Sequence, residues 1–271
     1  MTKVKADLHN HLKTSNIFKD KDFNRAIDAA YKRLGPGGIF EIVNFNDRRY
    51  EEFSNLKGYE RVYIGESNNG FYVPEKDIIV VKGQEVPTQK GHLLVLGLGS
   101  NKHLKQHKLL KDTLKEAKDN NGIIIIDHPF YSEGIGKHPR QLNSYYLLKN
   151  TDGIEIYNGE AAFGLPLDPL PFNANKKALE FYKITKENFP NVGALSSSDG
   201  HSMYELGSNW TEIDKPKIER DNFVNSLRES VRKTDLNTNR KNKKLILGSI
   251  DHIVDLIFLT KIAPKFRLNL N

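Results

Sequence analysis

The sequence predicts an α/β fold, and a single barrel suits it better than a doubly wound sheet. Short runs of apolar and β-branched residues recur along the chain, separated by longer stretches that mix charged and apolar residues. About seven such strand–helix units follow one another without a change in composition. Hydrophobic residues make up 38% of the 271 residues and aromatic residues 10%, which is enough to fill one large core. The doubly wound alternative stays open here, because both architectures use the same alternating units.

The expected strands are mostly apolar or β-branched, as strands buried on both faces of a parallel sheet should be. They are residues 4–8, 38–43, 77–81, 92–96, 122–127, 153–157 and 192–196. The stretches between them are long enough for helices and carry a charged and an apolar face, which is typical of helices that cover a sheet. The expected helices are residues 22–34, 101–120, 140–149 and 173–189. After Trp210 the pattern becomes helical and basic.

Composition excludes several kinds of site. The chain contains no cysteine, so disulfides, thiolate nucleophiles and cysteine-ligated metals are impossible, and any metal must be held by His, Asp and Glu. The 41 basic residues against 34 acidic ones give a net charge of +7, a modest excess that favours phosphorylated ligands. The first residues lack an apolar signal segment, and charged residues interrupt the apolar stretch at 245–262. We therefore expect a cytoplasmic protein without a membrane span.

Residues that bind metals gather at the ends of the expected strands, the edge where barrel active sites are built. His9 and His11 follow the first strand two residues apart, and in an extended segment this spacing points both imidazoles to one side. Asp199 and His201 follow the last strand with the same spacing. Taken singly, each histidine is also compatible with a structural or surface role.

Other expected strands carry the same kind of residue at an end. Glu85 ends an apolar strand, where a buried carboxylate needs a positive partner, either a metal ion or a nearby lysine. His92 opens the next strand, and His128 closes another just before a proline that stops the ladder. Glu155 and Asn158 lie at the end of the strand after that. So many strand ends with His, Glu or Asp favour one shared metal site over independent coincidences.

These residues stand in motifs that resemble, in order, those of the PHP family, the polymerase and histidinol phosphatase domain. The motifs are AspLeuHisAsnHisLeuLysThrSer (7–15), LysGlyGlnGluValPro with GlyHisLeuLeuValLeuGly (82–97), AspHisProPhe (127–130), AspGlyIleGluIleTyrAsnGly (152–159) and SerSerAspGlyHisSer (197–202). The resemblance implies a distorted, TIM-like (β/α)7 barrel over residues 1–215 and metal-dependent phosphoester hydrolysis. Residues 216–271 match no signature, and their pattern predicts a helical, basic extension packed on the barrel. Its polar segment at 234–244 is more typical of a solvated loop than of a nucleic-acid contact.

By this resemblance, six residues match the ligands of two divalent ions. The first ion is expected on His9, His11, Glu85 and Asp199, and the second on Glu85, His92 and His128, so that the glutamate bridges the two. Glu155 and Asn158 are expected to support these ligands from behind. Histidine and carboxylate donors suit zinc, manganese or ferrous iron, and the sequence does not choose among the three.

The resemblance also implies that a third ion is missing. Relatives with three ions have an acidic residue just after the first motif and an Asp-His pair after the second strand, acting with the last histidine. This chain has Asn16 at the first position and Phe45 and Asn46 at the pair. A shift of one residue in the alignment would bring Asp47 to the pair instead. Asn16 and Asn46 are expected to form hydrogen bonds beside the site, because a neutral amide is a weak ligand for a transition metal.

The implied activity is hydrolysis of a phosphomonoester or small phosphodiester, such as a nucleotide or an oligonucleotide end. Asp199 and His201 are the expected catalytic residues, since a histidine without a third ion can protonate the leaving group or bind the phosphate. A structural role for His201 is the alternative. The candidates for phosphate recognition are Arg48, Arg49, His138 and Arg140, the last two beside Lys137 in a glycine-rich loop that is also compatible with a purely solvated role.

Two other functions stay open. Loss of the third site is compatible with a non-catalytic or regulatory metal-binding protein. Some PHP relatives have a nuclease or polymerase-associated role, although 271 residues leave little room for a polymerase region beside the barrel. The natural substrate and the oligomeric state are not indicated by the sequence.

Overall fold

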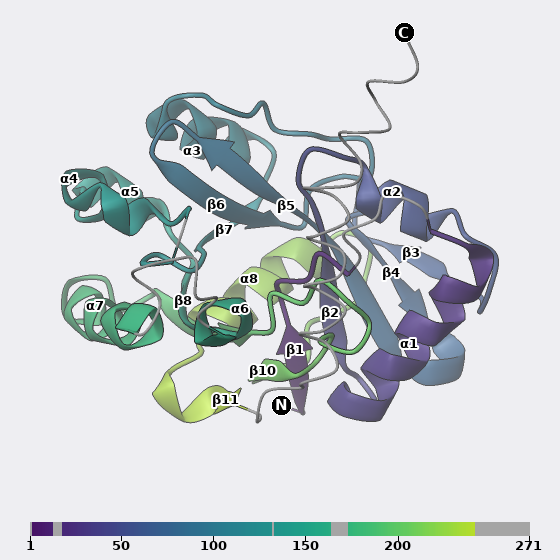
Figure 1. Cartoon of the computed structure of the whole chain (residues 1–271). Helices are drawn as coiled ribbons and strands as arrows, with labels where there is room; N and C mark the ends of the chain where they lie inside the picture. The colour runs from purple at the N-terminus through teal and green to yellow at the C-terminus, as the bar shows by residue number, and fades with distance from the viewer. Residues whose placement is uncertain (1, 13–17, 132, 164–172, 242–271) are drawn as a thin grey trace, which may run out of the picture.

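The structure is a computed structural model that describes residues 2–12, 18–131, 133–163 and 173–241. Within these residues the chain forms one sheet curved into a nearly closed barrel with helices around it (Figure 1), which confirms the predicted fold class. The strands are β1 (Lys3–Asp7), β2 (Ile39–Asn44), β3 (Val62–Ile64), β4 (Gly70–Val73), β5 (Ile78–Thr88), β6 (Gly91–Leu96), β7 (Ile123–Ile126), β8 (Gly153–Asn158), β9 (Gly193–Ser197), β10 (Asn209–Asp214) and β11 (Asn239–Lys241). The helices are α1 (Asp20–Leu34), α2 (Arg49–Ser54), α3 (Leu110–Asp119), α4 (Pro139–Leu142), α5 (Tyr145–Asn150), α6 (Gly159–Phe163), α7 (Ala174–Asn188) and α8 (Phe223–Arg232).

The strand order around the barrel is β11-β10-β1-β2-β5-β6-β7-β8-β9, with the β3–β4 hairpin attached to β5. The two ends of this order approach each other where Ser196 of β9 meets Thr211 of β10. The Ser196 amide donates to Thr211 Oγ1 at 2.7 Å, and the Thr211 hydroxyl donates to the Ser196 carbonyl at 3.1 Å. Figure 1 shows α1 and α2 on one side of the barrel and α4, α5 and α7 on the other.

Strict β/α alternation fails in the middle of the barrel. The pairs β1–β2, β2–β5, β7–β8 and β8–β9 are parallel, but β6 is antiparallel to both β5 and β7. Only Gln89 and Lys90 separate β5 from β6, and a parallel crossover needs a dozen or more residues. The strand expected at 77–81 therefore continues to Thr88 as one arm of a hairpin.

The central strands bury both faces, as their continuous apolar sequences predict. In β7, Ile123 and Ile125 pack in a cluster that includes β1, β2 and α8, whereas Ile124 and Ile126 pack against α3, α5 and α7. Not all buried polar side chains are at strand ends. Glu85, expected at the end of its strand, lies inside β5 because that strand continues to Thr88, and Lys82 lies inside the same strand.

Three expected elements differ from the structure. The helix expected at 101–120 begins only at Leu110, because the chain before it wraps the buried ammonium of Lys82, which donates to the carbonyls of Gly99, Ser100 and Lys102 at 2.8–2.9 Å. The helix expected at 140–149 is split into α4 and α5, and Ser144 caps the second by accepting from the Leu147 amide. The chain after Trp210 is not helical at once but completes β10, which pairs with β1.

The chain beyond residue 215 is joined to the barrel in the described part. Phe223, Leu227 and Val231 of α8 pack on the same cluster as β7, and β11 pairs antiparallel with β10. The expected domain boundary at 215 stays a prediction. The end of the polar segment expected at 234–244 and the rest of the expected helical extension, from residue 242 on, lie outside the described residues.

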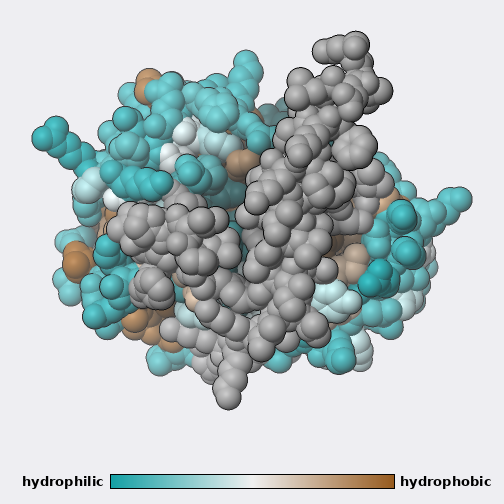
Figure 2. Space-filling model, in the orientation of Figure 1, coloured by the Kyte–Doolittle hydropathy of each residue, from teal (hydrophilic) through white to brown (hydrophobic). Residues whose placement is uncertain are grey.

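No helix among the described residues is long and apolar enough to cross a membrane. The face drawn in Figure 2 is mostly hydrophilic where it is coloured, with hydrophobic residues in small separate groups.

Candidate metal centre

Hydrogen bonds join the segment that follows β1 to the segment that follows β9. The Leu12 amide donates to the Gly200 carbonyl at 2.8 Å. Below this contact, the buried Asp7 carboxylate accepts from the Ser198 amide at 2.9 Å and from the Gly207 amide at 2.7 Å. Burial raises the pKa of Asp7 to about 7, although these bonds partly offset the effect. The two segments with paired metal-binding residues are thereby held face to face.

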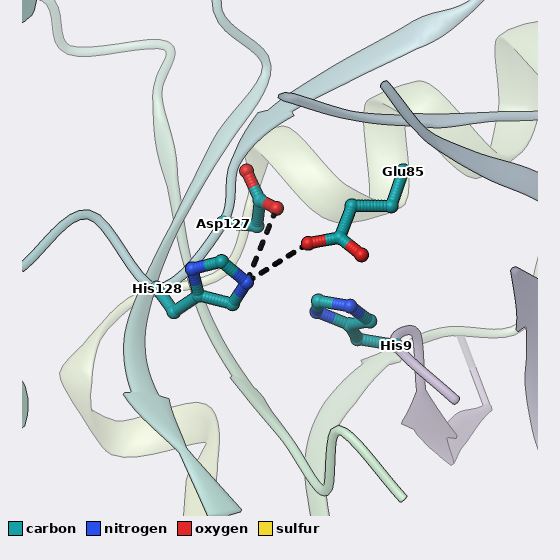
Figure 3. A group of neighbouring side chains, drawn as sticks. All are labelled: His9, Glu85, Asp127 and His128. Atoms are coloured by element: carbon teal, nitrogen blue, oxygen red, sulfur yellow. Dashed lines mark hydrogen bonds and ion pairs between the residues drawn. The ribbon is translucent and has the colours of Figure 1, made fainter. Parts of the chain in front are cut away.

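Glu85 is the centre of the cluster. Its Oε2 lies 3.2 Å from His11 Nε2, and its Oε1 lies 2.7 Å from His92 Nδ1 and 3.0 Å from His128 Nε2. Figure 3 shows the Glu85 carboxylate pointing toward His128, with His9 and Asp127 beside them. One buried carboxylate thus reaches histidines from three separate segments of the chain.

Glu85 does not form an ion pair with Lys82, the lysine on its own strand, although the sequence left a salt bridge to a nearby lysine open. Lys82 Nζ lies 2.5 Å from Glu51 Oε1, on the side of β5 away from the histidines. Side chains at 82 and 85 point to opposite faces of a strand, because their separation is an odd number of residues.

His9 and His11 lie on one side of their segment, as their spacing predicts. Their ring centroids are 5.4 Å apart, and the Nε2 atoms of both lie 3.4 Å from Asp199 Oδ1. His9 Nδ1 is 3.0 Å from Glu155 Oε1, so the ring donates there, and once the ring is neutral its lone pair is on Nε2. This is how a supporting carboxylate orients a metal-binding histidine.

Glu155 and Asn158 support several of the predicted ligands at once. Besides His9, Glu155 accepts from the Ser197 hydroxyl and, through Oε2, from the His128 amide at 2.8 Å. Asn158 Nδ2 donates to Glu155 Oε2 at 3.1 Å and to Asp199 Oδ2 at 2.9 Å. Both side chains therefore contact the predicted ligands, and their supporting role stays a prediction.

Several buried atoms of this cluster have no hydrogen-bond partner in the described part of the chain. They are His9 Nε2, His128 Nδ1, Asp199 Oδ1 and both carboxylate oxygens of Asp127. Buried polar atoms normally form hydrogen bonds, so a group of them without partners is typical of a site that binds an ion or a water molecule. In each of two groups, one donor atom from every residue lies within 4.8 Å of the donor atoms of the others: His9, Glu85, Asp127 and His128 form one group, and His9, His11 and Asp199 form the other. Histidine and carboxylate donors at this spacing are able to hold a divalent metal.

Attraction between carboxylates and imidazoles sets the protonation of the metal-free cluster. Burial alone would raise the pKa of Glu85, but its bonds to the histidines hold it well below its ordinary value. Burial alone would lower the pKa of His9 and His128, but Asp199 and Asp127, respectively, raise it well above the ordinary value. These imidazoles therefore hold protons that a metal ion must displace.

Metal affinity is consequently expected to fall on acidification. Because the raised histidine pKa values let protons compete, each displaced proton should weaken binding by about tenfold per pH unit between about pH 8 and pH 6. Calorimetric titration with zinc in two buffers of different ionisation enthalpy counts the released protons. Identical heats in both buffers, and an affinity independent of pH, would contradict this expectation.

Replacing Glu155 by glutamine should weaken metal binding without destroying the site. The change removes the charge that orients His9 but keeps a side chain of the same shape. Loss of such a partner typically costs roughly 10–100-fold in metal affinity. Equilibrium dialysis against manganese measures it. Glu187→Gln, an exposed change on α7, is the control and should bind as the parent does.

The predicted phosphate-binding arginines lie in different settings. Arg49 is buried, and its guanidinium donates to the His11 carbonyl at 2.7 Å and pairs with Asp47 at 2.6 Å. Arg49 thus fixes the backbone at His11, and the Asp47 carboxylate pairs with Arg49. Arg48 is exposed and lines a cavity of about 400 Å³ with Asn46 and His103.

The remaining predicted residues are less closely tied to the cluster. Phe45 lies against it, with its ring centroid 5.4 Å from that of His92. His138 is half-buried just before α4, while Lys137 and Arg140 are exposed. The loop before them touches the site through the Glu133 carbonyl, which accepts from the His92 amide at 2.9 Å. Asn16 lies outside the described residues.

The sequence analysis missed two carboxylates. Asp127 directly follows β7, before His128, and is fully buried, and burial raises its pKa to about 7. Glu160, on α6, groups with Asp199 and His201. Burial raises the pKa of Glu160 well above its ordinary value, and the Asp199 carboxylate raises it further. Position at a strand end, the criterion that found the other residues, also applies to both.

The fold and this cluster define a barrel of the PHP type. A family model described as PHP-associated matches residues 172–231, and with the fold it confirms the resemblance to the PHP family. The structure of PsfC from Pseudomonas syringae PB-5123 is similar with a TM-score of 0.60 at 14% identity, over 95% of this chain and 98% of that one. The search of curated proteins gives no match.

Endonuclease Q is a second similar structure. The lesion-specific endonuclease PfuEndoQ from Pyrococcus furiosus gives a TM-score of 0.54 at 16% identity, over 87% of this chain and 57% of that one. Endonuclease Q in complex with a 27-mer duplex substrate, with an abasic lesion at the active site, gives 0.53 at 15% identity, over 87% of this chain and 58% of that one. This chain therefore spans little more than half the length of endonuclease Q, and the likeness concerns the fold.

Proposed function

We propose that this protein is a metal-dependent hydrolase of a phosphomonoester or a small phosphodiester, such as a nucleotide or an oligonucleotide end. The observation that carries the proposal is the position of Glu85, whose two oxygens reach His11 on one side and His92 and His128 on the other. The proposed ligands are His9, His11, Glu85 and Asp199 for one ion and Glu85, His92 and His128 for the other. Zinc, manganese or ferrous iron suits this donor set.

When bound, two such ions supply the positive charge that activates water and neutralises phosphoryl oxygens. The chain's own residues supply orientation. Asp199 is held by Asn158, and His9 is held by Glu155. His201 Nδ1 donates to the Asp199 carbonyl at 3.0 Å, so the lone pair of the neutral ring is on Nε2. His201 Nε2 can act on the leaving group of the phosphoester in two ways. When it is protonated it can donate a proton to the leaving oxygen, and when it is neutral it can bind a cation.

The proposed place for the rest of the substrate is the cavity beyond Phe45. It is lined by side chains that donate or accept hydrogen bonds, namely Asn46, Asp47, Arg48, Asn101, His103 and Gln106. Arg48 supplies the exposed positive charge that a phosphorylated ligand needs. His138 and Arg140 remain candidates on the opposite loop.

Hydrolysis assays with defined metal content test this function. Metal-free protein, reconstituted with manganese or zinc, is offered p-nitrophenyl phosphate, bis-p-nitrophenyl phosphate, nucleoside monophosphates and a 5′-phosphorylated dinucleotide. We expect hydrolysis of at least one, lost on chelation and in His9→Ala, and retained in Glu187→Gln. Tight metal binding without turnover of any phosphoester would contradict the proposal and favour the regulatory alternative.

A further inference from the structure

A chain of buried hydrogen bonds ends at His103, in the wall of the cavity beyond Phe45. The ammonium of Lys82 lies 2.5 Å from Glu51 Oε1, and Asn44 Nδ2 donates to Glu51 Oε2 at 2.7 Å. The same amide nitrogen lies 3.1 Å from His103 Nε2. Lys82 and Asn44 are fully buried, whereas His103 is exposed and lines the cavity. The chain of bonds therefore leads from the buried interior to the proposed place for the substrate.

The amide of Asn44 has one satisfactory orientation. Its Oδ1 accepts from the Tyr50 amide at 2.6 Å, while its Nδ2 faces the Glu51 carboxylate. A flipped amide would place an oxygen against that carboxylate and an NH2 group against the Tyr50 N–H. Asn44 Nδ2 is thus a donor to both of its partners, and His103 Nε2 must accept.

This bond sets the protonation of the His103 ring. An imidazole nitrogen that accepts carries no hydrogen, so the ring is neutral and its proton is on Nδ1. Partial burial and the Lys82 ammonium lower the pKa of His103, which favours the same neutral form. Within the described residues, His103 Nδ1 has no hydrogen-bond partner. A neutral N–H donor is therefore left for a ligand.

We propose that His103 determines substrate specificity: its Nδ1–H recognises an uncharged acceptor, such as a hydroxyl or carbonyl oxygen, on the body of the substrate. The inference rests on the proposed function, because it takes the phosphoryl group to lie at the metal centre and the rest of the substrate in the cavity. It narrows the substrate class to a phosphomonoester with a polar, uncharged body and no second phosphate group.

The rest of the cavity agrees with an uncharged body. Most of its other lining side chains are amides, namely Asn46, Asn101 and Gln106. Its one acid, Asp47, is paired with Arg49, and its one cation, Arg48, donates to Asn101 Oδ1 at 3.3 Å. A nucleic-acid strand is bound mainly through several cations that contact its phosphates. The cavity instead offers hydrogen bonds from neutral groups.

The backbone on both sides of His103 is held by β5. The Lys102 carbonyl accepts from Lys82 Nζ at 2.8 Å. On the other side, the Gln84 side chain accepts from the Leu104 amide at 2.8 Å and donates to the Leu104 carbonyl at 3.0 Å. A donor that is fixed before binding loses little conformational entropy when a ligand arrives. His103 is therefore suited to discriminate between ligands.

Nitrogen NMR of the histidine rings tests the tautomer without any substrate. Long-range proton–nitrogen correlation spectra of the zinc-loaded protein near neutral pH distinguish protonated from unprotonated ring nitrogens. The signals that are absent from both His103→Phe and His103→Asn identify this ring. We expect a proton on Nδ1 and none on Nε2. A proton on Nε2, or a ring that exchanges between the two tautomers, would overturn the proposal.

Steady-state kinetics of the manganese-loaded protein test recognition. Ribose 5-phosphate and uridine 5′-monophosphate have acceptors on an uncharged body, and phenyl phosphate has none. His103→Phe should raise KM for the first two by about two- to tenfold, the range for loss of one neutral hydrogen bond, and leave kcat and the KM for phenyl phosphate nearly unchanged. His103→Asn keeps an N–H near the position of Nδ1 and should restore most of the affinity.

The control is His107→Asn, an exposed change on the same loop, and it should behave as the parent does. Residue 107 has a φ of 57°, a conformation that asparagine tolerates. Melting temperatures of the variants show whether each one folds.

The outcomes separate this proposal from the proposed function. An equal change in KM for ribose 5-phosphate and phenyl phosphate, or faster turnover of uridine 3′,5′-bisphosphate than of the monophosphate, would overturn the role of His103 and leave the hydrolase standing. Absence of turnover in the parent would contradict the proposed function. Calorimetric titration of uridine 5′-monophosphate into the zinc-loaded parent and His103→Phe then decides recognition: weaker binding by the variant supports it, and equal affinity or no binding overturns it.

Discussion

Glu85→Gln is expected to weaken metal binding by about two to three orders of magnitude, more than any other single ligand change. The substitution removes the one carboxylate that reaches His11, His92 and His128 together. Removing one partner from a buried charged cluster costs about 3–5 kcal/mol, and each 1.4 kcal/mol is a factor of about ten in affinity. Turnover of any phosphoester should fall with it.

The comparison variants for Glu85→Gln are His92→Ala and Glu187→Gln. His92 is expected on one ion only, so its loss should leave the other bound, while Glu187 is exposed and should have no effect. Competition for manganese against a chelating dye gives the affinities. Equal retention of both ions by Glu85→Gln and the parent would refute the bridging role.

Metal binding should also stabilise the folded protein strongly. The metal-free cluster buries like charges and unpartnered atoms that an ion would compensate, among them Asp199 Oδ1 and both oxygens of Asp127. A ligand at a thousandfold excess over its dissociation constant adds roughly 4 kcal/mol to the free energy of unfolding. For a chain of this size that corresponds to a rise in melting temperature of roughly 8–16 °C.

Differential scanning calorimetry with zinc or manganese, before and after chelation, measures the shift. His9→Ala should show a clearly smaller rise, because it removes a residue present in both donor groups. A melting temperature that is unchanged by saturating metal in the parent protein would show that the cluster is satisfied without an ion.

The sequence predicted the fold class because buried strands leave a local signal, and it named site residues that lie together in the structure, although their roles stay a prediction. Mostly apolar runs marked the buried strands, and histidines and acids near their ends marked the region where the cluster forms. The structure brings His9, His11, Glu85, His92, His128 and Asp199 into one cluster, with Glu155 and Asn158 behind them.

Other features depend on contacts that no local pattern reveals. The hairpin between β5 and β6 replaces a crossover, and the irregular chain before α3 is shaped by the buried ammonium of Lys82. Arg49 was expected to bind phosphate, yet its contacts are with Asp47 and the His11 carbonyl. Glu160 and Asp127 were missed although they directly follow strand segments, as the other residues of the cluster do, and only the structure groups them with their partners.

Anomalous X-ray diffraction from crystals grown with manganese or zinc tests the two-ion centre most directly. We predict two strong peaks on either side of the Glu85 carboxylate, one within bonding distance of His9, His11 and Asp199 and the other near His92 and His128. Peaks elsewhere, or a single ion that Glu85 does not contact, would contradict the proposed centre.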